Sequence, residues 1–166
     1  MHIDALGASV STDARIRPGT VFKCDFGNVS GTFLKAEVAD EPETIWLVHL
    51  DSESGMPEFF SPSHLHPDHC LVFPDATIVL REFTTPRPLG RDLIGSVIMS
   101  EQGVAVYAAS HANPTFDGHV VDMESGRRAM VAPGQVCRCP SWAIYPAQPG
   151  AGREDLTPLV SWPRNA

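Results

Sequence analysis

The densest group of potential metal ligands in this sequence lies in one short segment. It reads His64-Leu65-His66-Pro67-Asp68-His69, and Cys70 follows directly. Imidazole, carboxylate and thiolate are the groups that zinc prefers, and alternate side chains on an extended segment point the same way. If the chain binds zinc, we therefore expect the ligands to be His64, His66, Asp68 and His69.

These six residues resemble the H-x-H-x-D-H signature of the metallo-β-lactamase superfamily. There the two alternating histidines bind one zinc ion and the Asp-His pair binds a second, so the resemblance implies a zinc-dependent hydrolase with a metal-bound hydroxide as nucleophile. It also implies further ligands at His111, Asp117 or His119. The resemblance ends with the signature, because Cys70-Leu71-Val72-Phe73-Pro74 stands where the family has a helix with small residues.

A structural zinc site is an alternative to the hydrolase. Cys137 and Cys139 are two residues apart, a spacing on a strand that suits a metal ion and is poor for a mutual disulfide. They would join ligands from the segment His64 to Cys70 around one ion. No second C-x-x-C or H-x-x-x-H block completes a known four-ligand pattern, so we expect no cofactor, with zinc as the alternative.

Other catalytic signatures are missing from the sequence. There is no G-x-S-x-G nucleophile elbow and no glycine-rich phosphate loop. A thiol of Cys24 or Cys70 with His49 as its base is a pairing that only the fold can bring together. The sequence therefore favours a protein that binds over one that catalyses.

The charge is strongly asymmetric along the chain. The net charge is −8; residues 1–83 carry 5 Lys and Arg against 13 Asp and Glu, and residues 84–166 carry 7 against 7. Such a field repels a phosphate backbone, so we expect a basic protein or peptide as partner and no direct contact with nucleic acid. A solvated acidic surface that keeps the protein soluble is the alternative.

No export signal or membrane span is apparent in the sequence. The segment Met1-His2-Ile3-Asp4 lacks a basic region and an apolar run, and no uncharged hydrophobic stretch approaches the roughly 18 residues that a spanning helix needs. We therefore expect a soluble cytoplasmic protein without a membrane partner. In that compartment the thiols are reduced, namely those of Cys24, Cys70, Cys137 and Cys139.

Short β-branched and aromatic runs separated by Gly, Pro, Asp and Ser predict an all-β fold. The predicted strands are 20–24, 32–38, 44–50, 77–81, 94–100, 104–109, 119–123, 128–131 and 135–138, and 159–162 is predicted as an edge strand. Residues 84–91, with two prolines and a glycine, predict a connector between two domains.

The order of these strands is similar to that of the SH3-like small barrel, and it occurs twice with a faint echo of sequence. We therefore expect two consecutive SH3-like barrels that arose by duplication, with one larger barrel or sandwich as the alternative. The expected divisions are a flexible arm 1–16, a first barrel 17–83, the connector 84–91, a second barrel 92–146 and a proline-rich tail 147–166.

Aromatic residues in or beside the strands predict where such a module would bind. Small barrels bind peptides through aromatic-lined grooves, and ordinary core packing is the alternative for each ring. The predicted binding residues are Trp142, Tyr145, Tyr107 and Phe59. Together these features favour a non-enzymatic adaptor whose acidic N-terminal barrel contacts a basic partner while the second serves assembly. An open sheet edge would also allow a homodimer.

Overall fold

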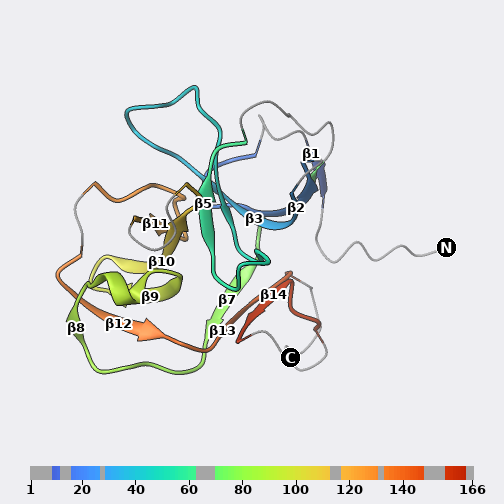
Figure 1. Cartoon of the computed structure of the whole chain (residues 1–166). Helices are drawn as coiled ribbons and strands as arrows, with labels where there is room; N and C mark the ends of the chain where they lie inside the picture. Colours follow the sequence, from blue (N-terminus) through green and yellow to red (C-terminus); the bar gives the residue numbers. More distant parts are fainter. Residues whose placement is uncertain are drawn as a thin grey trace.

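The computed structural model describes residues 9–11, 16–26, 29–62, 70–112, 117–130, 133–147 and 156–163. The regular secondary structure of these segments is β-strand (Figure 1) apart from one short 3₁₀ helix, η2 (Arg91–Leu93). The strands are β1 (Ser9–Ser11), β2 (Val21–Asp25), β3 (Ser30–Ala36), β4 (Trp46–His49), β5 (Glu58–Phe60), β6 (Cys70–Phe73), β7 (Thr77–Leu80), β8 (Arg87–Pro88), β9 (Ser96–Ser100), β10 (Gly103–Ser110), β11 (Gly118–Asp122), β12 (Gln135–Cys139), β13 (Trp142–Tyr145) and β14 (Val160–Trp162).

The described strands form two open sheets. The larger has the order β1-β6-β2-β3-β4-β5-β10-β9-β12-β8, with β11 added beside β10, and the smaller has the order β14-β13-β7. Neither sheet returns to pair its first strand with its last. The all-β prediction is confirmed, whereas two closed SH3-like barrels, or one larger closed barrel, are not.

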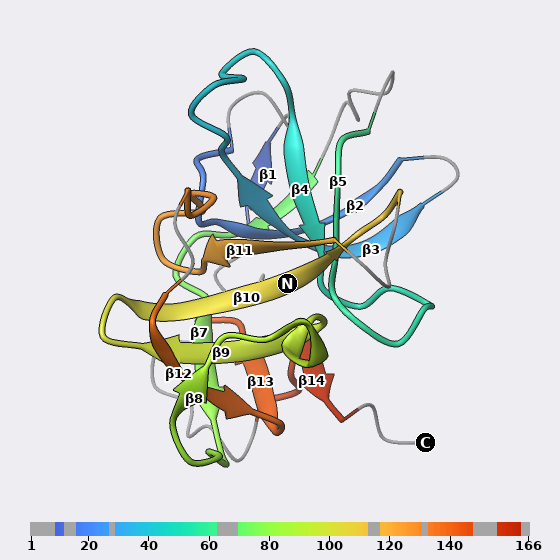
Figure 2. The ribbon, with the colours of Figure 1, turned by 60° about the vertical axis from the view of Figure 1, so that its left-hand side comes forward.

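Both sheets draw strands from the two sides of residues 84–91. In the larger sheet, β5 pairs in parallel with β10, Glu58 lying opposite Ala109. In the smaller sheet, β7 pairs with β13, and the two lie side by side in Figure 1 and Figure 2. Sheet hydrogen bonding is therefore continuous from one half of the sequence to the other, instead of closing on itself within each half.

A tight backbone contact also joins the two halves of the sequence. Gly126 has a φ of 70°, and a Cβ there would collide with Gly19 N, Lys35 O and Pro18 C. The Gly126 carbonyl accepts a hydrogen bond from Glu37 N at 2.8 Å. Only glycine satisfies both the left-handed backbone and the close approach.

Strands β2 and β3 separate two apolar cores. Val21 faces Leu34 across the pair and Phe22 faces Phe33, and because side chains alternate along a strand these two rows lie on opposite faces. The Val21–Leu34 row joins a core shared with β9, β10, β11, β13 and β14, and the Phe22–Phe33 row joins a second core. Both faces of this hairpin are therefore covered, which fixes its register.

Most predicted strands correspond to strands of the structure. Residues 84–91 run along β12, where Thr84 N donates to Arg138 O at 3.0 Å and β8 pairs with Gln135 and Val136. The predicted edge strand near residue 160 is β14, which lies at the edge of the smaller sheet.

No helix within the described segments is long and apolar enough to cross a membrane.

Candidate functional site

The predicted zinc ligands His64, His66, Asp68 and His69 lie outside the described residues, so this site stays a prediction. The other proposed ligands are on separate strands: His119 is on β11, and Cys137 and Cys139 are on β12. Within the described segments, no three His, Cys, Asp or Glu side chains are grouped so that they could hold a metal ion.

Two of the four aromatic residues predicted to bind are core residues. Phe59 is 2% exposed and stacks on Trp46 with ring centroids 4.8 Å apart, and Trp142 is 3% exposed. Trp142 is buried because β13 is the central strand of the smaller sheet, between β7 and β14. The rings of Tyr107 and Tyr145 are half-buried, and the Tyr145 hydroxyl accepts a hydrogen bond from Arg81 Nη2 at 2.9 Å.

The aromatic stack continues from Phe59 to His119, whose ring centroid is 4.4 Å from that of Phe59. Burial lowers the pKa of His119, the nearby Arg128 lowers it further, and Asp117 opposes the shift. The buried Nδ1 atom of His119 has no hydrogen-bond partner among the described residues. This imidazole is therefore held in its neutral form as part of an apolar stack, which is a packing role.

Two imidazole–carboxylate pairs flank the ring of Phe60 on β5. His49 lies at the end of β4, and its Nε2 is 3.2 Å from Asp51 Oδ1. His111 directly follows β10, and its Nδ1 is 2.9 Å from Glu58 Oε2. The Phe60 centroid is 6.4 Å from the first imidazole and 6.0 Å from the second. The pairs therefore belong to one continuous patch of the sheet.

The first pair is built into the interior. The His49 ring stacks on Phe33 with centroids 4.7 Å apart, and Asp51 Oδ1 accepts a hydrogen bond from Thr32 N at 2.6 Å. Burial raises the pKa of Asp51, but the contacts with His49 and Thr32 more than offset this, so the pKa lies below its ordinary value. The aspartate therefore favours its charged form, and its bond with Thr32 N holds the residues that follow β4 against β3.

The second pair is formed where the two halves of the sequence meet. The parallel pairing of β5 with β10 and the bond from His111 N to Phe59 O, 3.1 Å long, bring His111 beside Glu58. Burial raises the pKa of Glu58, but contacts with Ser54, His111 and Ser52 outweigh it and lower the pKa overall. The imidazole itself is 67% exposed and can reach an external group.

Ser52 completes this second group, but not as a nucleophile. Its hydroxyl donates to Glu58 Oε1 at 2.9 Å, while His111 contacts the other oxygen of the same carboxylate. In a serine triad the imidazole lies between hydroxyl and carboxylate and takes the hydroxyl proton. Here the carboxylate lies between the other two, so the imidazole is not placed to take the hydroxyl proton as it does in a triad.

The sequence left open a pairing of the Cys24 or Cys70 thiol with the His49 imidazole. In the structure these groups have other neighbours. Cys70 Sγ donates to Cys24 Sγ at 3.2 Å, and His49 Nε2 faces Asp51 instead. Sequence reasoning named His49 and His111 but missed the roles of Asp51, Ser52 and Glu58. The spacing His49-x-Asp51 was a signal that could have been used, whereas Glu58 and His111 are 53 residues apart.

Carboxylates also gather at the turn between β3 and β4, residues 38–45, which we call the acidic turn. Asp40, Glu41 and Glu43 are all exposed there. Two successive hydrogen bonds shape the turn, from Glu41 N to Val38 O at 3.0 Å and from Thr44 N to Glu41 O at 3.1 Å. Val38 is 3% exposed and anchors the turn in the shared core. The three carboxylates are therefore presented on a fixed backbone.

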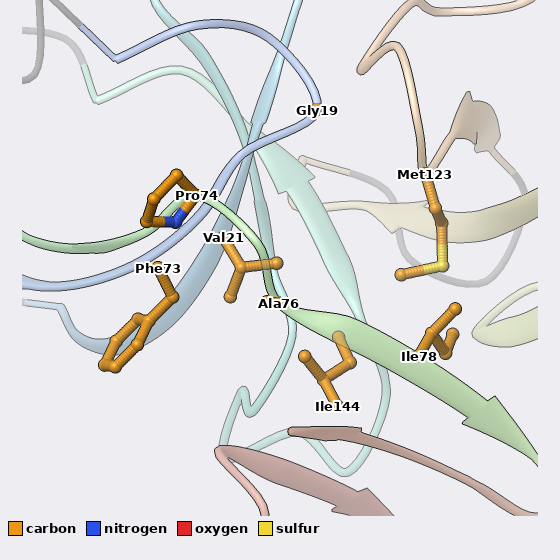
Figure 3. A pocket seen from close by; sticks show the side chains of 8 residues that line it. All are labelled: Gly19, Val21, Phe73, Pro74, Ala76, Ile78, Met123 and Ile144. Atoms are coloured by element: carbon orange, nitrogen blue, oxygen red, sulfur yellow. The ribbon is translucent and has the colours of Figure 1, made fainter. Parts of the chain in front are cut away.

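A small pocket opens between the strands of both sheets (Figure 3). It is lined by Gly19, Val21, Phe73, Pro74, Ala76, Ile78, Met123 and Ile144. Its volume is about 50 Å³, whereas sites for metabolites and cofactors are typically about 300–1,000 Å³. This pocket is too small for such a ligand.

Comparison with protein-family models, with curated proteins and with solved structures finds no match for this chain.

Proposed function

We propose that this chain is a non-enzymatic binding protein whose acidic first half contacts a basic protein or peptide. The observation that carries the proposal is the acidic turn, where three exposed carboxylates stand within four residues on an ordered backbone. Since the backbone is already ordered, a partner would lose less free energy in fixing it on binding.

The surroundings of the acidic turn favour the same function. Among described residues 16–83, the exposed acidic residues are Asp25, Asp40, Glu41, Glu43, Glu53, Asp75 and Glu82, and the exposed basic ones are Arg17, Lys23 and Arg81. A surface with this excess attracts cationic partners over distances comparable to the Debye length, about 8 Å at physiological salt. It would speed their association more than it would tighten the final complex.

A fluorescence-anisotropy titration with a labelled peptide of alternating Lys and Gly tests the proposal. We expect saturable binding that weakens as salt rises, because the contacts are between exposed charges. A matched peptide of alternating Glu and Gly should not bind. Binding should also be unchanged by a metal chelator. Equal binding of both peptides, or no binding of the basic one, would contradict the proposal.

Two charge-matched triple variants locate the contact. Asp40→Asn/Glu41→Gln/Glu43→Gln removes the carboxylates of the acidic turn, and Glu101→Gln/Asp117→Asn/Glu124→Gln removes three exposed carboxylates from the second half. Both raise the net charge by the same amount. At about 0.5 kcal/mol for each exposed pair, the first variant should weaken binding roughly tenfold and the second by less than about twofold. Equal losses would mean that net charge alone is responsible.

A further inference from the structure

Two thiols on neighbouring strands of the larger sheet lie close together. Cys24 Sγ on β2 and Cys70 Sγ on β6 are 3.2 Å apart, and the contact is between two thiols that are not joined in a disulfide. The strands are antiparallel with Lys23 opposite Leu71, so the next pair in that register is Cys24 opposite Cys70. The contact is therefore set by the pairing of two strands.

This placement satisfies the geometry that a disulfide requires. Residues directly opposite in an antiparallel pair have Cα atoms about 4.5 or 5.5 Å apart. Both separations lie within the range of about 4.4–6.8 Å that disulfides span. To reach a bond length of about 2.05 Å, the sulfur atoms need to approach by roughly 1 Å, a movement that side-chain rotation supplies. The strands can stay in register.

We propose that Cys24 and Cys70 form an oxidative modification site, a dithiol that a low-molecular-weight disulfide such as oxidised glutathione converts into a cross-strand disulfide. Cys24 is half-buried and Cys70 is 1% exposed, so the reagent reaches Cys24 first. The order of the two sulfur atoms in the reaction follows from this difference in exposure.

The reaction is two successive thiol–disulfide exchanges. The deprotonated Cys24 sulfur attacks one sulfur of oxidised glutathione, which forms a mixed disulfide and releases the first glutathione thiolate. The deprotonated Cys70 sulfur then attacks Cys24 Sγ, which breaks the mixed disulfide and releases the second. Two protein thiols are oxidised, one glutathione disulfide is reduced to two thiols, and the protons lost by the cysteines end on the glutathione.

The other two cysteines provide an internal control. Cys137 and Cys139 are alternate residues of the single strand β12, so their side chains project in parallel and do not face each other across a strand pair. Cys139 is buried, and burial raises its pKa to about 11, with Cys137 adding to the shift. We expect this pair to stay reduced under conditions that oxidise the first.

A disulfide between Cys24 and Cys70 would constrain the segment of chain that lies between them. Cys24 and Cys70 are 46 residues apart, and the loop between them contains β3, β4, β5 and the acidic turn. The disulfide would also attach Cys70, the residue that directly follows the histidine-rich segment, to β2. The modification therefore constrains the region that we propose to bind a partner, although it does not depend on that proposal.

The test is a peptide map of the whole chain after incubation in a glutathione redox buffer and alkylation of the remaining thiols. Trypsin separates the four cysteines, because it cleaves after Lys23, Lys35, Arg81, Arg128 and Arg138. We expect residues 24–35 linked to residues 36–81, with Cys137 and Cys139 alkylated. A persistent glutathione adduct on Cys24 with Cys70 alkylated would overturn the proposal, as would any other linkage.

Single substitutions confirm the order of the two exchanges. Cys70→Ser should stop the reaction at the glutathione adduct of Cys24, and Cys24→Ser should leave Cys70 unmodified because it is buried. The double variant Cys137→Ser/Cys139→Ser should form the cross-link at the wild-type rate. If a variant fails to fold, the peptide map of the wild-type protein still decides the question. A cross-link lost in the Cys137/Cys139 variant would contradict the assignment.

Discussion

The two imidazole–carboxylate pairs beside Phe60 contain the same chemical groups but differ in which group is buried. In the His49–Asp51 pair, the imidazole side chain is 8% exposed and the carboxylate 29%. In the His111–Glu58 pair, the imidazole is 67% exposed and the carboxylate 13%. The first pair buries its base and the second buries its acid.

This difference follows from where each residue lies in the sheet. His49 is paired with Phe33 inside the β3–β4 ladder, and its ring stacks on that of Phe33. His111 lies just beyond the end of β10, where its Nδ1 is held by Glu58 and most of its ring is exposed. A short distance between an imidazole and a carboxylate is therefore a poor guide to role. The exposure of each partner shows which group is structural and which is available to solvent.

The largest effect should come from breaking the buried pair. Asp51→Ala removes the acceptor of the Thr32 N–H and leaves the buried His49 ring without its polar neighbour. We expect a loss of about 2–3 kcal/mol in the free energy of unfolding, measured by urea denaturation. Asp51→Asn keeps an acceptor oxygen and should lose about 1 kcal/mol. Equal losses in the two variants would show that the acceptor role is not what matters.

The pH dependence of stability tests both carboxylates. The folded-state pKa values of Asp51 and Glu58 lie below their ordinary values of 3.8 and 4.5. Each therefore contributes stability that is fully present above its ordinary pKa and is lost as pH falls through the lower folded pKa. In urea denaturation from about pH 6 to about pH 3, Asp51→Asn and Glu58→Gln should each reduce this fall. A pH profile unchanged in both variants would contradict the assignment.

The smallest effect should come from removing the exposed imidazole. His111→Ala deletes an exposed group whose ion pair is screened by water, so the free energy of unfolding should change by less than about 0.5 kcal/mol. Glu58→Ala should cost more, because Ser52 then loses the acceptor of its hydroxyl. Thermal unfolding of the two variants side by side measures the contrast. A larger loss in His111→Ala than in Glu58→Ala would reverse our reading of this pair.

Much of the local structure was predictable from the sequence, because it depends on alternation and turn residues. Runs such as Thr20–Cys24 and Val104–Ala109 carry the β-branched residues of strands, and they coincide with β2 and β10. The pairing of β5 with β10 was not predictable, since nothing in either segment specifies a partner so distant in sequence. The expectation of two separate barrels assumed that neighbouring strands pair within each half.

The sequence identified some residues of the candidate site, but it did not predict how they are arranged or how exposed they are. The histidines at positions 49 and 111 were visible, but their exposure depends on which strands cover them. Trp142 illustrates the same limit: it was predicted to bind, yet its strand lies between β7 and β14 and its side chain is packed in the shared core. The histidine-rich segment 64–69 remains a sequence-based prediction, because it lies outside the described residues.

The pairing of β7 with β13 has a consequence for synthesis of the chain. Arg81 and Tyr145, which bond at the end of this strand pair, are 64 residues apart. At about 5–20 residues per second, roughly 3–13 s separate the synthesis of the two strands. Until β13 emerges from the ribosome, β7 is an apolar strand with no neighbour in the smaller sheet. Nascent chains thus pass through a stage in which a molecular chaperone could bind the edge of β7 that β13 covers in the folded chain.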